Sequence, residues 1–329
     1  MKIFITGATG YIGNNLALRL AGEGHTVHAL VRSPQKAITL NHPNIILFTG
    51  DITDAASVAK AITGCQQAYH LAAYARVWAK DVSTYYKLNV EGTKHVLDAA
   101  LTHKVSKVVF TSTAGVLGPS GNRPVKEDDP RIGDVLNEYE DTKTQAEALC
   151  LDYVHKHGMH IVTVNPPRIY GPGIETESNA LTKLTKLYMS GKWKIMPGDG
   201  TKRGSYVYID DIVNGHVLAM EKGRSGERYI LSGVNASYQE FFDTLAQVTG
   251  AKRKLINMPV WAMLIAGNAM MLRTKLTGKP PLLTPKWIKK YLYNWSLSCE
   301  KAQQELGYTY IPLKEGLQKT VDWIRQQQQ

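Results

Sequence analysis

Apolar positions in the first half of the chain follow two alternating periods. Short apolar runs typical of buried strands occupy residues 1–5, 26–31, 45–48, 68–72, 107–112 and 160–165. Between these runs, apolar residues recur at helical spacing, most clearly over residues 54–62, 83–103 and 139–157. Strands that alternate with helices are typical of a parallel sheet that is covered on both faces. The pattern therefore predicts an α/β fold, a doubly wound sheet of six or seven parallel strands.

The alternation stops at Pro166 and Pro167. Because proline interrupts regular elements, we place a domain edge here. Residues 205–209 and 210–220 again have the pattern of a strand and a helix, and we expect both to return to the large sheet. The predicted domains are therefore a larger one of residues 1–168 plus about 205–232 and a smaller, discontinuous C-terminal substrate domain of about 169–204 and 233–329.

Residues 258–272 form a long apolar stretch. It falls short of the ~20 residues that a membrane-spanning helix needs, and it contains Gly267 and Asn268. We expect a helix that covers an apolar pocket, and no membrane span. The alternative is weak peripheral association with anionic lipid, for which the flanking cations are Lys252, Arg253, Lys254, Arg273 and Lys275.

Composition narrows the class of protein. With 329 residues, 43% of them hydrophobic and 20% charged, the chain is typical of a globular protein. The net charge of +11 is scattered, which favours a solvated surface and a phosphate-bearing cofactor over nucleic acid. Cys65, Cys150 and Cys299 lack metal-ligand spacing, so we expect no metal site and a reducing compartment. Since the first strand begins at Met1, we expect no secretory signal and a cytoplasmic location.

Three glycines follow the first predicted strand at intervals of three residues, in the sequence that opens a helix. Gly7 permits a backbone angle that other residues adopt only at a cost, and Gly10 lets a pyrophosphate approach the main chain. Gly13 lets the helix lie close to the strand. The backbone N–H groups of Tyr11 and Ile12 then face the anion at the positive end of the helix. This strand-turn-helix setting predicts a dinucleotide site.

The second chemical signal is the sequence Tyr139-Glu-Asp-Thr-Lys143. Residues four apart share one face of a helix, so the phenol and the ammonium group point into one cleft. We expect the charge of Lys143 to lower the pKa of Tyr139 from ~10 toward neutral pH. Upstream, Thr111, Ser112 and Thr113 end a predicted sheet strand and supply hydroxyls for a substrate oxygen. Together these residues predict proton transfer beside a dinucleotide.

Eight motifs, in this order, resemble those of the extended short-chain dehydrogenases/reductases, the group that includes dihydroflavonol reductases, 3β-hydroxysteroid dehydrogenases and nucleotide-sugar epimerases. The resemblance covers nearly the whole chain and implies a Rossmann domain that binds NAD(P). The motifs are TGATGYIG (6–13), GDITD (50–54), HLAA (70–73), NVEGT (89–93), FTSTAGVLG (110–118), YEDTK (139–143), NPPRIYGPG (165–173) and YVYIDD (206–211).

The resemblance implies three catalytic residues. Thr113 would bind the substrate carbonyl, Tyr139 would be the acid or base, and Lys143 would hold the nicotinamide ribose. Asn89 would be a structural hydrogen-bonding residue between a strand and a helix. Besides Tyr139 and Lys143, the implied cofactor-binding residues are Gly7, Thr9, Gly10, Tyr11, Ile12, Gly13, Asp51, Ile52, Leu71, Ala72, Ala73, Thr111, Pro166 and Ile169.

The choice of cofactor depends on the residue that closes the second strand. An acidic residue there would bind the ribose hydroxyls of NAD, but this chain has Arg32. By resemblance to dihydroflavonol reductases, Arg32 faces a 2′-phosphate, with Lys36 as a second cation. We therefore expect NADP(H) in preference to NAD(H). The alternative is a solvated arginine, with NAD bound equally well.

Several reactions fit this site. Nucleotide-sugar dehydratases carry an Asp-Glu pair after the catalytic hydroxyl, whereas this chain has Ala114 and Gly115, which disfavours dehydration. The leading hypothesis is NADPH-dependent reduction of a ketone or aldehyde, like that of dihydroflavonol reductases. The alternatives are nucleotide-sugar epimerisation, alcohol oxidation of the 3β-hydroxysteroid dehydrogenase type, and an NADP-sensing protein without catalysis.

The resemblance also implies a homodimer. In many relatives the helices that correspond to residues 83–103 and 139–157 form a four-helix interface. The expected partner besides the second copy is a small carbonyl or alcohol substrate. Side chains that could line its pocket are Arg76, Trp78, Arg168, Tyr170, Tyr206 and Trp261.

Overall fold

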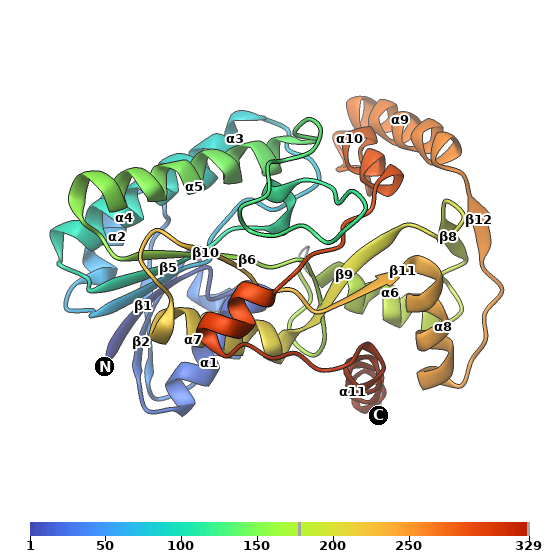
Figure 1. Ribbon diagram of the computed structural model, residues 1–329. Coiled ribbons are helices and arrows are strands. Elements are labelled where there is room, and N and C mark those ends of the chain that lie inside the picture. Colours follow the sequence, from blue (N-terminus) through green and yellow to red (C-terminus); the bar gives the residue numbers. More distant parts are fainter. Residues whose placement is uncertain (177–178, 328–329) are drawn as a thin grey trace.

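A computed structural model describes residues 1–176 and 179–327. Its centre is a seven-stranded parallel sheet, which confirms the predicted doubly wound α/β fold (Figure 1). The strand order reverses between β1 and β4, and ligands of such sheets bind beside this reversal. From one edge to the other the strands are β10 (Arg228–Ile230), β6 (Ile161–Asn165), β5 (Lys107–Thr111), β4 (Gln67–His70), β1 (Lys2–Thr6), β2 (Thr26–Val31) and β3 (Ile45–Thr49).

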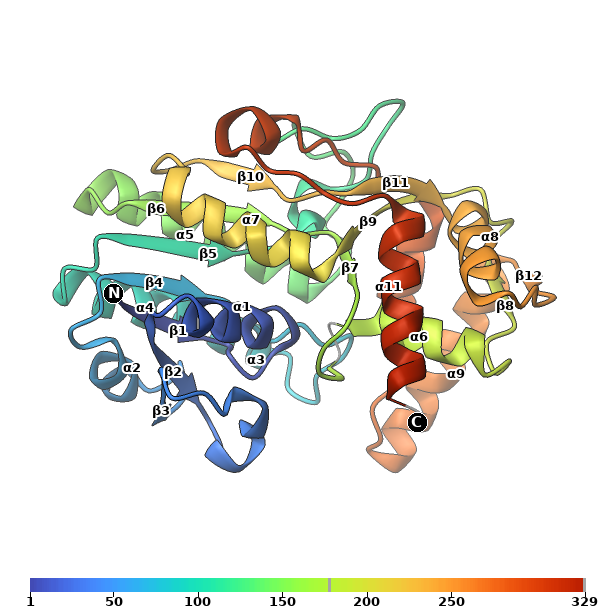
Figure 2. The ribbon, with the colours of Figure 1, turned by 90° about the horizontal axis from the view of Figure 1, so that it is seen from below.

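Two helical layers cover the sheet (Figures 1 and 2). One face carries α1 (Tyr11–Gly22) and α7 (Ile209–Lys222), and the other carries α2 (Ala55–Ile62), α4 (Gly92–Thr102) and α5 (Glu138–His157). Successive strand residues point to opposite faces, so Ile3 and Ile5 belong to one apolar core and Phe4 to the other. All three are essentially inaccessible to solvent. This double burial explains the unbroken apolar runs in the sequence.

The predicted helix over residues 83–103 forms, but it contains one wide turn. It consists of α3 (Ser83–Tyr86), a π-helical turn η3 (Lys87–Glu91) and α4. Such a turn inserts one residue into the helical ladder and is frequent at functional sites. Here it lies beside the amino-terminal part of α5.

The segment predicted as a strand over residues 205–209 forms β9 (Arg203–Tyr208), but its predicted return to the large sheet is wrong. β9 lies instead between β7 (Arg168–Tyr170) and β11 (Val234–Ser237) in a separate three-stranded sheet. Pro166 and Pro167 have no backbone N–H to continue the large sheet, so the chain leaves it there. The helix α7 does return, and it delivers β10 to the edge of the large sheet beside β6.

The remaining elements surround the small sheet or stand beyond it (Figure 2). They include a two-stranded pair, β8 (Ile195–Pro197) and β12 (Ile256–Met258), and the helices α6 (Ala180–Met189), α8 (Tyr238–Thr249), α9 (Val260–Thr277), α10 (Pro285–Ile288) with its following turn η6 (Lys289–Leu292), and α11 (Leu313–Gln326).

The division into two domains stays a prediction, and residues 177–178 and 328–329 of the predicted substrate domain lie outside the described residues. The three cysteines are free and buried. Within residues 1–176 and 179–327, no helix is long and apolar enough to cross a membrane.

Candidate active site

The glycine turn after β1 is shaped by close backbone contacts. Gly7 has φ +74°, and a Cβ there would come within 2.7 Å of the backbone nitrogen of Ala72. A Cβ on Gly13 would lie 2.2 Å from the carbonyl oxygen of Gly7. Gly10 caps α1 without any side-chain hydrogen bond, so the N–H groups of the first helical turn face outward. The turn therefore fits an anionic group such as a pyrophosphate.

The end of β4 lies against this turn through a buried hydrogen-bond network. His70 Nδ1 lies 2.6 Å from the Thr6 hydroxyl, and His70 Nε2 lies 2.9 Å from the Thr93 hydroxyl. Burial, with the nearby Lys143 charge, lowers the pKa of His70 to about 3, so the imidazole is neutral. The Thr6 hydroxyl also accepts a hydrogen bond from the backbone of Ala72. The network holds the predicted cofactor segment, Leu71, Ala72 and Ala73, beside the glycine turn.

Tyr139 and Lys143 lie one turn apart on α5, at the carboxyl edge of the large sheet. Lys143 is only 1% exposed. Its Nζ donates a 2.8 Å hydrogen bond to the carbonyl oxygen of Thr111 and lies 3.9 Å from the centre of the Phe110 ring. Burial lowers the pKa of Lys143 to about 8. The ammonium group is thus anchored to the end of β5.

The pKa of Tyr139 is raised to about 12, mainly because burial disfavours the phenolate. A hydrogen bond with the Thr113 side chain opposes the rise, and the charge of Glu140 adds to it. The expectation that Lys143 lowers the pKa of Tyr139 is therefore wrong for this structure, because the ammonium group points to Thr111 and Phe110. At neutral pH the phenol keeps its proton.

The three hydroxyls at the end of β5 have different surroundings. The Thr113 hydroxyl accepts a hydrogen bond from the backbone of Gly115 and lies near the phenol of Tyr139. The Thr111 hydroxyl points to the other side of the sheet, where it lies 2.9 Å from Nε2 of the buried His216. The Ser112 hydroxyl is buried and has no partner among the described residues. Only Thr113 therefore joins Tyr139 in one cluster.

Asn89 stands at the π-helical turn and connects two parts of the site. Its Oδ1 accepts a 2.7 Å hydrogen bond from the backbone of Tyr74, and its Nδ2 donates a 2.9 Å bond to the Thr142 hydroxyl on α5. The side chain is fully buried. Asn89 thus fastens the loop after β4 to α5, as the structural interpretation of this residue predicted.

The far end of the predicted cofactor site is exposed. Arg32 closes β2, and its Nε lies 3.9 Å from the carboxylate of Asp51 at the end of β3. The Arg32 side chain is 77% exposed, so this pair is loose. Lys36 is also exposed, whereas Ile52 is buried against Gly92.

The segment after β6 passes directly beside the hydroxyl cluster. The carbonyl of Pro166 accepts a 3.0 Å hydrogen bond from the backbone of Ala114, and Asn165 Nδ2 donates to the carbonyl of Thr113. Ile169 is buried. The predicted cofactor residues Pro166 and Ile169 therefore start at the catalytic cluster and lead into β7.

A cap over the site comes from a segment that the sequence did not indicate. The Trp287 ring of α10 stacks on the Tyr139 ring, with 6.4 Å between centres and planes 21° apart. Lys290 Nζ lies 2.7 Å from Oε1 of Glu140, whose side chain has no solvent exposure. The other oxygen of Glu140 accepts a 2.9 Å hydrogen bond from Arg131. One buried carboxylate of α5 therefore joins the cap and the loop before α5 to this helix.

A second cluster forms around Arg168. Arg168 and Tyr206 are both candidates for the substrate pocket, but the sequence did not indicate the contact of Arg168 with Tyr238. The guanidinium donates a 2.9 Å hydrogen bond to the Tyr238 hydroxyl and stands over the rings of Tyr206 and Tyr238, at 5.5 and 5.1 Å from their centres. A Cβ on Gly204 would lie 1.6 Å from Nη1 of Arg168, so a larger residue there would displace the guanidinium from its present position. Among the described residues, no carboxylate lies within ion-pair distance of Arg168.

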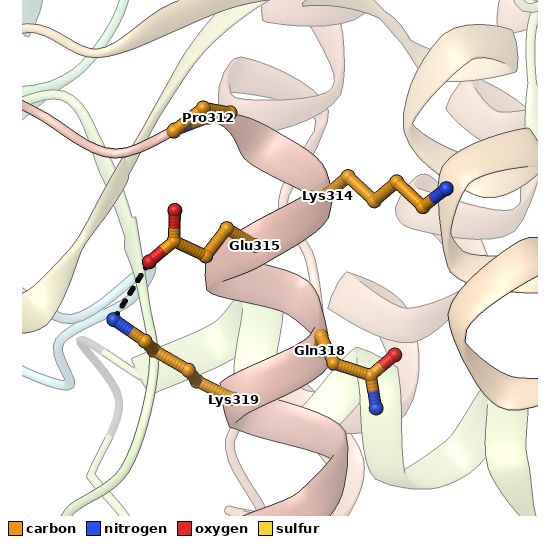
Figure 3. A pocket seen from close by; sticks show the side chains of 5 residues that line it. All are labelled: Pro312, Lys314, Glu315, Gln318 and Lys319. Carbon is orange, nitrogen blue, oxygen red and sulfur yellow. Dashed lines mark ion pairs between the residues drawn. The ribbon is translucent and has the colours of Figure 1, made fainter.

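A surface depression elsewhere does not belong to this site. Figure 3 shows it along α11, with the Glu315 carboxylate and the Lys319 ammonium 2.9 Å apart. None of its lining residues is a predicted site residue; they are Pro312, Lys314, Glu315, Gln318 and Lys319.

Comparison with known proteins relates the whole chain to oxidoreductases and epimerases. A putative dihydroflavonol 4-reductase of Synechocystis sp. is 28% identical over 98% of this chain and 94% of its own length. A 3-beta-hydroxysteroid dehydrogenase of Mycolicibacterium neoaurum is 28% identical over 93% of this chain and 86% of its own. The crystal structure of UDP-glucuronic acid 4-epimerase from Bacillus cereus, in complex with UDP-glucuronic acid and NAD, is similar with a TM-score of 0.80 at 25% identity, over 99% of this chain and 100% of that chain.

The model of one protein family, described as the NAD dependent epimerase/dehydratase family, matches residues 3–232. This match includes the glycine turn, the hydroxyl strand and the Tyr139–Lys143 helix. The chain therefore belongs to the NAD-dependent epimerase/dehydratase family, and it is an NAD(P)-dependent oxidoreductase that acts on CH-OH or C=O groups.

Proposed function

We propose that this protein uses NADPH to reduce a ketone or aldehyde, with Tyr139 as the proton donor. The observation that carries the proposal is the protonated, partly buried phenol of Tyr139 beside Thr113, one helical turn from Lys143. A phenol with a pKa of about 12 is a poor base at neutral pH, but it readily gives its proton to the alkoxide that forms when a carbonyl accepts hydride. The reductase names among the relatives support this direction.

Each group of this chain has a distinct task in the proposal. The bound nicotinamide would supply the hydride. Thr113 orients the carbonyl oxygen, and Tyr139 transfers the phenolic proton to it. Lys143 holds the ribose and contributes positive charge where negative charge develops. The glycine turn binds the pyrophosphate, and the Trp287 cap limits the access of water to the phenol.

The proposal predicts that replacing Tyr139 by Phe lowers turnover by about 10²- to 10⁴-fold, because the proton donor is lost. NADPH binding, measured by quenching of protein fluorescence, should stay within about twofold, since the phenol only borders the cofactor site. Tyr153→Phe is the matched control: this residue lies on the same helix, and its hydroxyl bonds Asp98 far from the site. The assay follows NADPH absorbance with a panel of aromatic and aliphatic carbonyl compounds. Full activity of Tyr139→Phe would disprove the assigned role.

The preference for NADPH is part of the same proposal. Arg32 is exposed and only loosely paired with Asp51, so its guanidinium is available to a 2′-phosphate, with Lys36 nearby in the chain. Arg32→Ala should weaken NADPH binding about tenfold and leave NADH binding unchanged, because charge-assisted hydrogen bonds to phosphate are lost. Equal affinities of the native protein for both cofactors would refute the preference.

A second candidate is epimerisation of a nucleotide sugar. It is favoured by the similarity to the Bacillus cereus epimerase over the entire chain. The same Thr113, Tyr139 and Lys143 would then remove and return a proton while hydride leaves and re-enters one carbon. Chromatography separates the proposals: an epimerase forms an isomeric sugar nucleotide without net oxidation of the cofactor, whereas a reductase consumes NADPH in proportion to product.

Two further hypotheses concern the same site. Alcohol oxidation of the 3β-hydroxysteroid dehydrogenase type is the reverse reaction, and product formation from secondary alcohols with NADP⁺ would reveal it. A sensor without catalysis has no use for the Thr113, Tyr139 and Lys143 cluster, which argues against that hypothesis.

We also propose a homodimer through α3, α4 and α5. Light scattering tests this proposal, and a monomeric mass would overturn it.

A further inference from the structure

Helix α9 is apolar on two opposite sides, but only one side is packed. The packed side carries Met263, Gly267 and Thr274, all buried. It faces α10, and a Cβ on Gly267 would lie 2.6 Å from Cδ1 of Ile288. The packed side therefore contacts α10 and the turn after it, and the expectation that the helix covers an apolar pocket stays a prediction.

The opposite side of α9 is an exposed apolar stripe. Trp261, Ile265, Leu272 and Leu276 are between 60% and 79% exposed. At about 100° per residue, these four side chains fall within an arc of about 60° on the helix, opposite the buried side. Arg273 and Lys275 follow on the two flanks of the stripe. The exposed Asn268 lies at the edge of this arc, between Ile265 and Leu272. Isolated exposed apolar residues are ordinary, but four large ones on one side of a helix indicate an interaction surface.

The segment that contains α9 carries charge of one sign. Residues 252–299 contain nine Lys and Arg residues and no Asp or Glu, so they carry most of the net charge of +11. Among the described residues only Lys286 and Lys290 of these nine form ion pairs, with Glu138 and Glu140. The seven others are all exposed, and they are Lys252, Arg253, Lys254, Arg273, Lys275, Lys279 and Lys289.

The position of α9 suits a flat, extended partner. The helix stands at the periphery of the molecule, remote from the large sheet, and its main packing partners among the described elements are α10 and the following turn η6 (Figures 1 and 2). A convex apolar stripe with cations on both flanks matches a surface that is apolar at depth and anionic above. The exposed Leu282 extends the apolar surface beyond the helix.

We propose that α9 docks this protein on the surface of an anionic lipid bilayer, with the stripe among the acyl chains and the flanking Arg273 and Lys275 at the headgroups. This inference does not depend on the reaction catalysed. Docking would hold the helix in the plane of the interface, because the stripe runs along its whole length and the two flanking cations reach upward from it.

The test is co-sedimentation of the full chain with vesicles of equal parts phosphatidylcholine and phosphatidylglycerol, and with phosphatidylcholine alone. We expect binding to the anionic vesicles that weakens with added salt, and much weaker binding to the neutral ones. Arg273→Gln with Lys275→Gln should reduce the partition coefficient about fivefold per lost charge, whereas Lys60→Gln, an exposed lysine on α2, should not.

A separate pair of variants tests the contribution of the apolar stripe to membrane binding. Leu276→Ser should reduce partition about tenfold, because the side chain no longer enters the acyl region. Ile38→Ser is the control, since Ile38 is equally exposed, at 79%, outside this stripe. Both variants should melt like the native protein, which shows that folding is intact. Native protein that stays in the supernatant, or equal partition of both variants, would overturn the proposal.

The other occupant of this face would be a second copy of the chain. Light scattering without vesicles distinguishes it: if Ile265→Ser converts a dimer into a monomer, the stripe is an interface between copies and the lipid proposal is wrong. Quenching by brominated lipid provides a direct positive result. We expect quenching in the native protein and a clear reduction of it in Trp261→Phe.

Discussion

The buried carboxylate of Glu140 allows a prediction about stability, for which the neighbouring Glu138 provides the control. Both residues lie in the first turn of α5, and each pairs with a lysine of the cap segment. Glu140 has no exposed side-chain surface and also binds Arg131, whereas the pair of Glu138 with Lys286 is largely exposed. Replacing each by Gln removes one negative charge from the same helical turn, so any helix-dipole effect is common to both.

The expected magnitudes differ because the dielectric surroundings differ. Removing one partner of a buried ion pair costs ~3–5 kcal/mol, while an exposed pair contributes ~0–1 kcal/mol. At ~2.1 cal/mol/K per residue, the unfolding entropy of 329 residues is ~0.7 kcal/mol/K. Glu140→Gln should therefore lower Tm by ~4–7 °C through its pair, and Glu138→Gln by less than ~1.5 °C.

Differential scanning calorimetry at neutral pH and fixed scan rate measures both shifts. A double variant, Glu140→Gln with Lys290→Met, should recover much of the loss, because the Lys290 ammonium is then not left without its carboxylate, while Arg131 keeps its hydrogen bonds to the carbonyls of Gly115 and Val116. If Glu140→Gln melts no lower than Glu138→Gln, the carboxylate does not join the cap to the catalytic helix. In that case the stacking of Trp287 on Tyr139 would need another explanation.

Three more outcomes follow from single buried groups. Burial lowers the pKa of Lys143 to about 8, so between pH 8 and 10.5 the unfolded chain binds a proton that the folded chain has released. The Tm of the native protein should therefore rise relative to that of Lys143→Met as the pH increases from 7 to 10. Parallel profiles of Tm against pH would contradict this. Gly204→Ala should lower Tm because its Cβ meets the guanidinium of Arg168, and an additional Arg168→Ala should relieve most of that loss; additive effects would rule out the contact. Asn89→Leu should cost ~2–4 kcal/mol in urea unfolding, because its buried partners lose their hydrogen bonds, and an unchanged midpoint would contradict the role of this amide.

The sequence predicts the large sheet well because burial on both faces leaves a strong pattern. Strand 26–31 has the predicted bounds, and its neighbours deviate by one or two residues at an end. The pattern does not show which sheet β9 joins, because that depends on the prolines after β6 and on β10 taking the sheet edge. Nor does helical periodicity show the π-helical turn at Asn89, because the four residues of α3 that precede it are too few to reveal a change of phase.

Part of the candidate site could likewise be predicted from the sequence, and part of it could not. Tyr139 and Lys143 are four residues apart, so helical geometry brings them together whatever the rest of the chain does. Trp287 and Lys290 reach the same place from far along the chain, and only tertiary packing reveals them. The pKa of Tyr139 could not be predicted from spacing, because it depends on how deeply the phenol is buried and on where the lysine points.

Burial shifts the pKa values of the two candidate catalytic groups in opposite directions, and both shifts suit the proposed reduction. It raises the pKa of the Tyr139 phenol to about 12 and lowers that of the Lys143 ammonium to about 8, so the neutral acid and the cation are both present at pH 7. Among the described residues no carboxylate pairs with Lys143, so its charge is available to stabilise an oxyanion. In the proposed reduction, an alkoxide that forms near these groups would meet a proton donor and a cation that no carboxylate neutralises. In the direction of oxidation, the phenol of Tyr139 would first have to lose its proton, and burial of the phenol opposes this loss. The neighbouring side chains of the cluster, Thr113 and Lys143, contain no carboxylate or imidazole that could accept the proton.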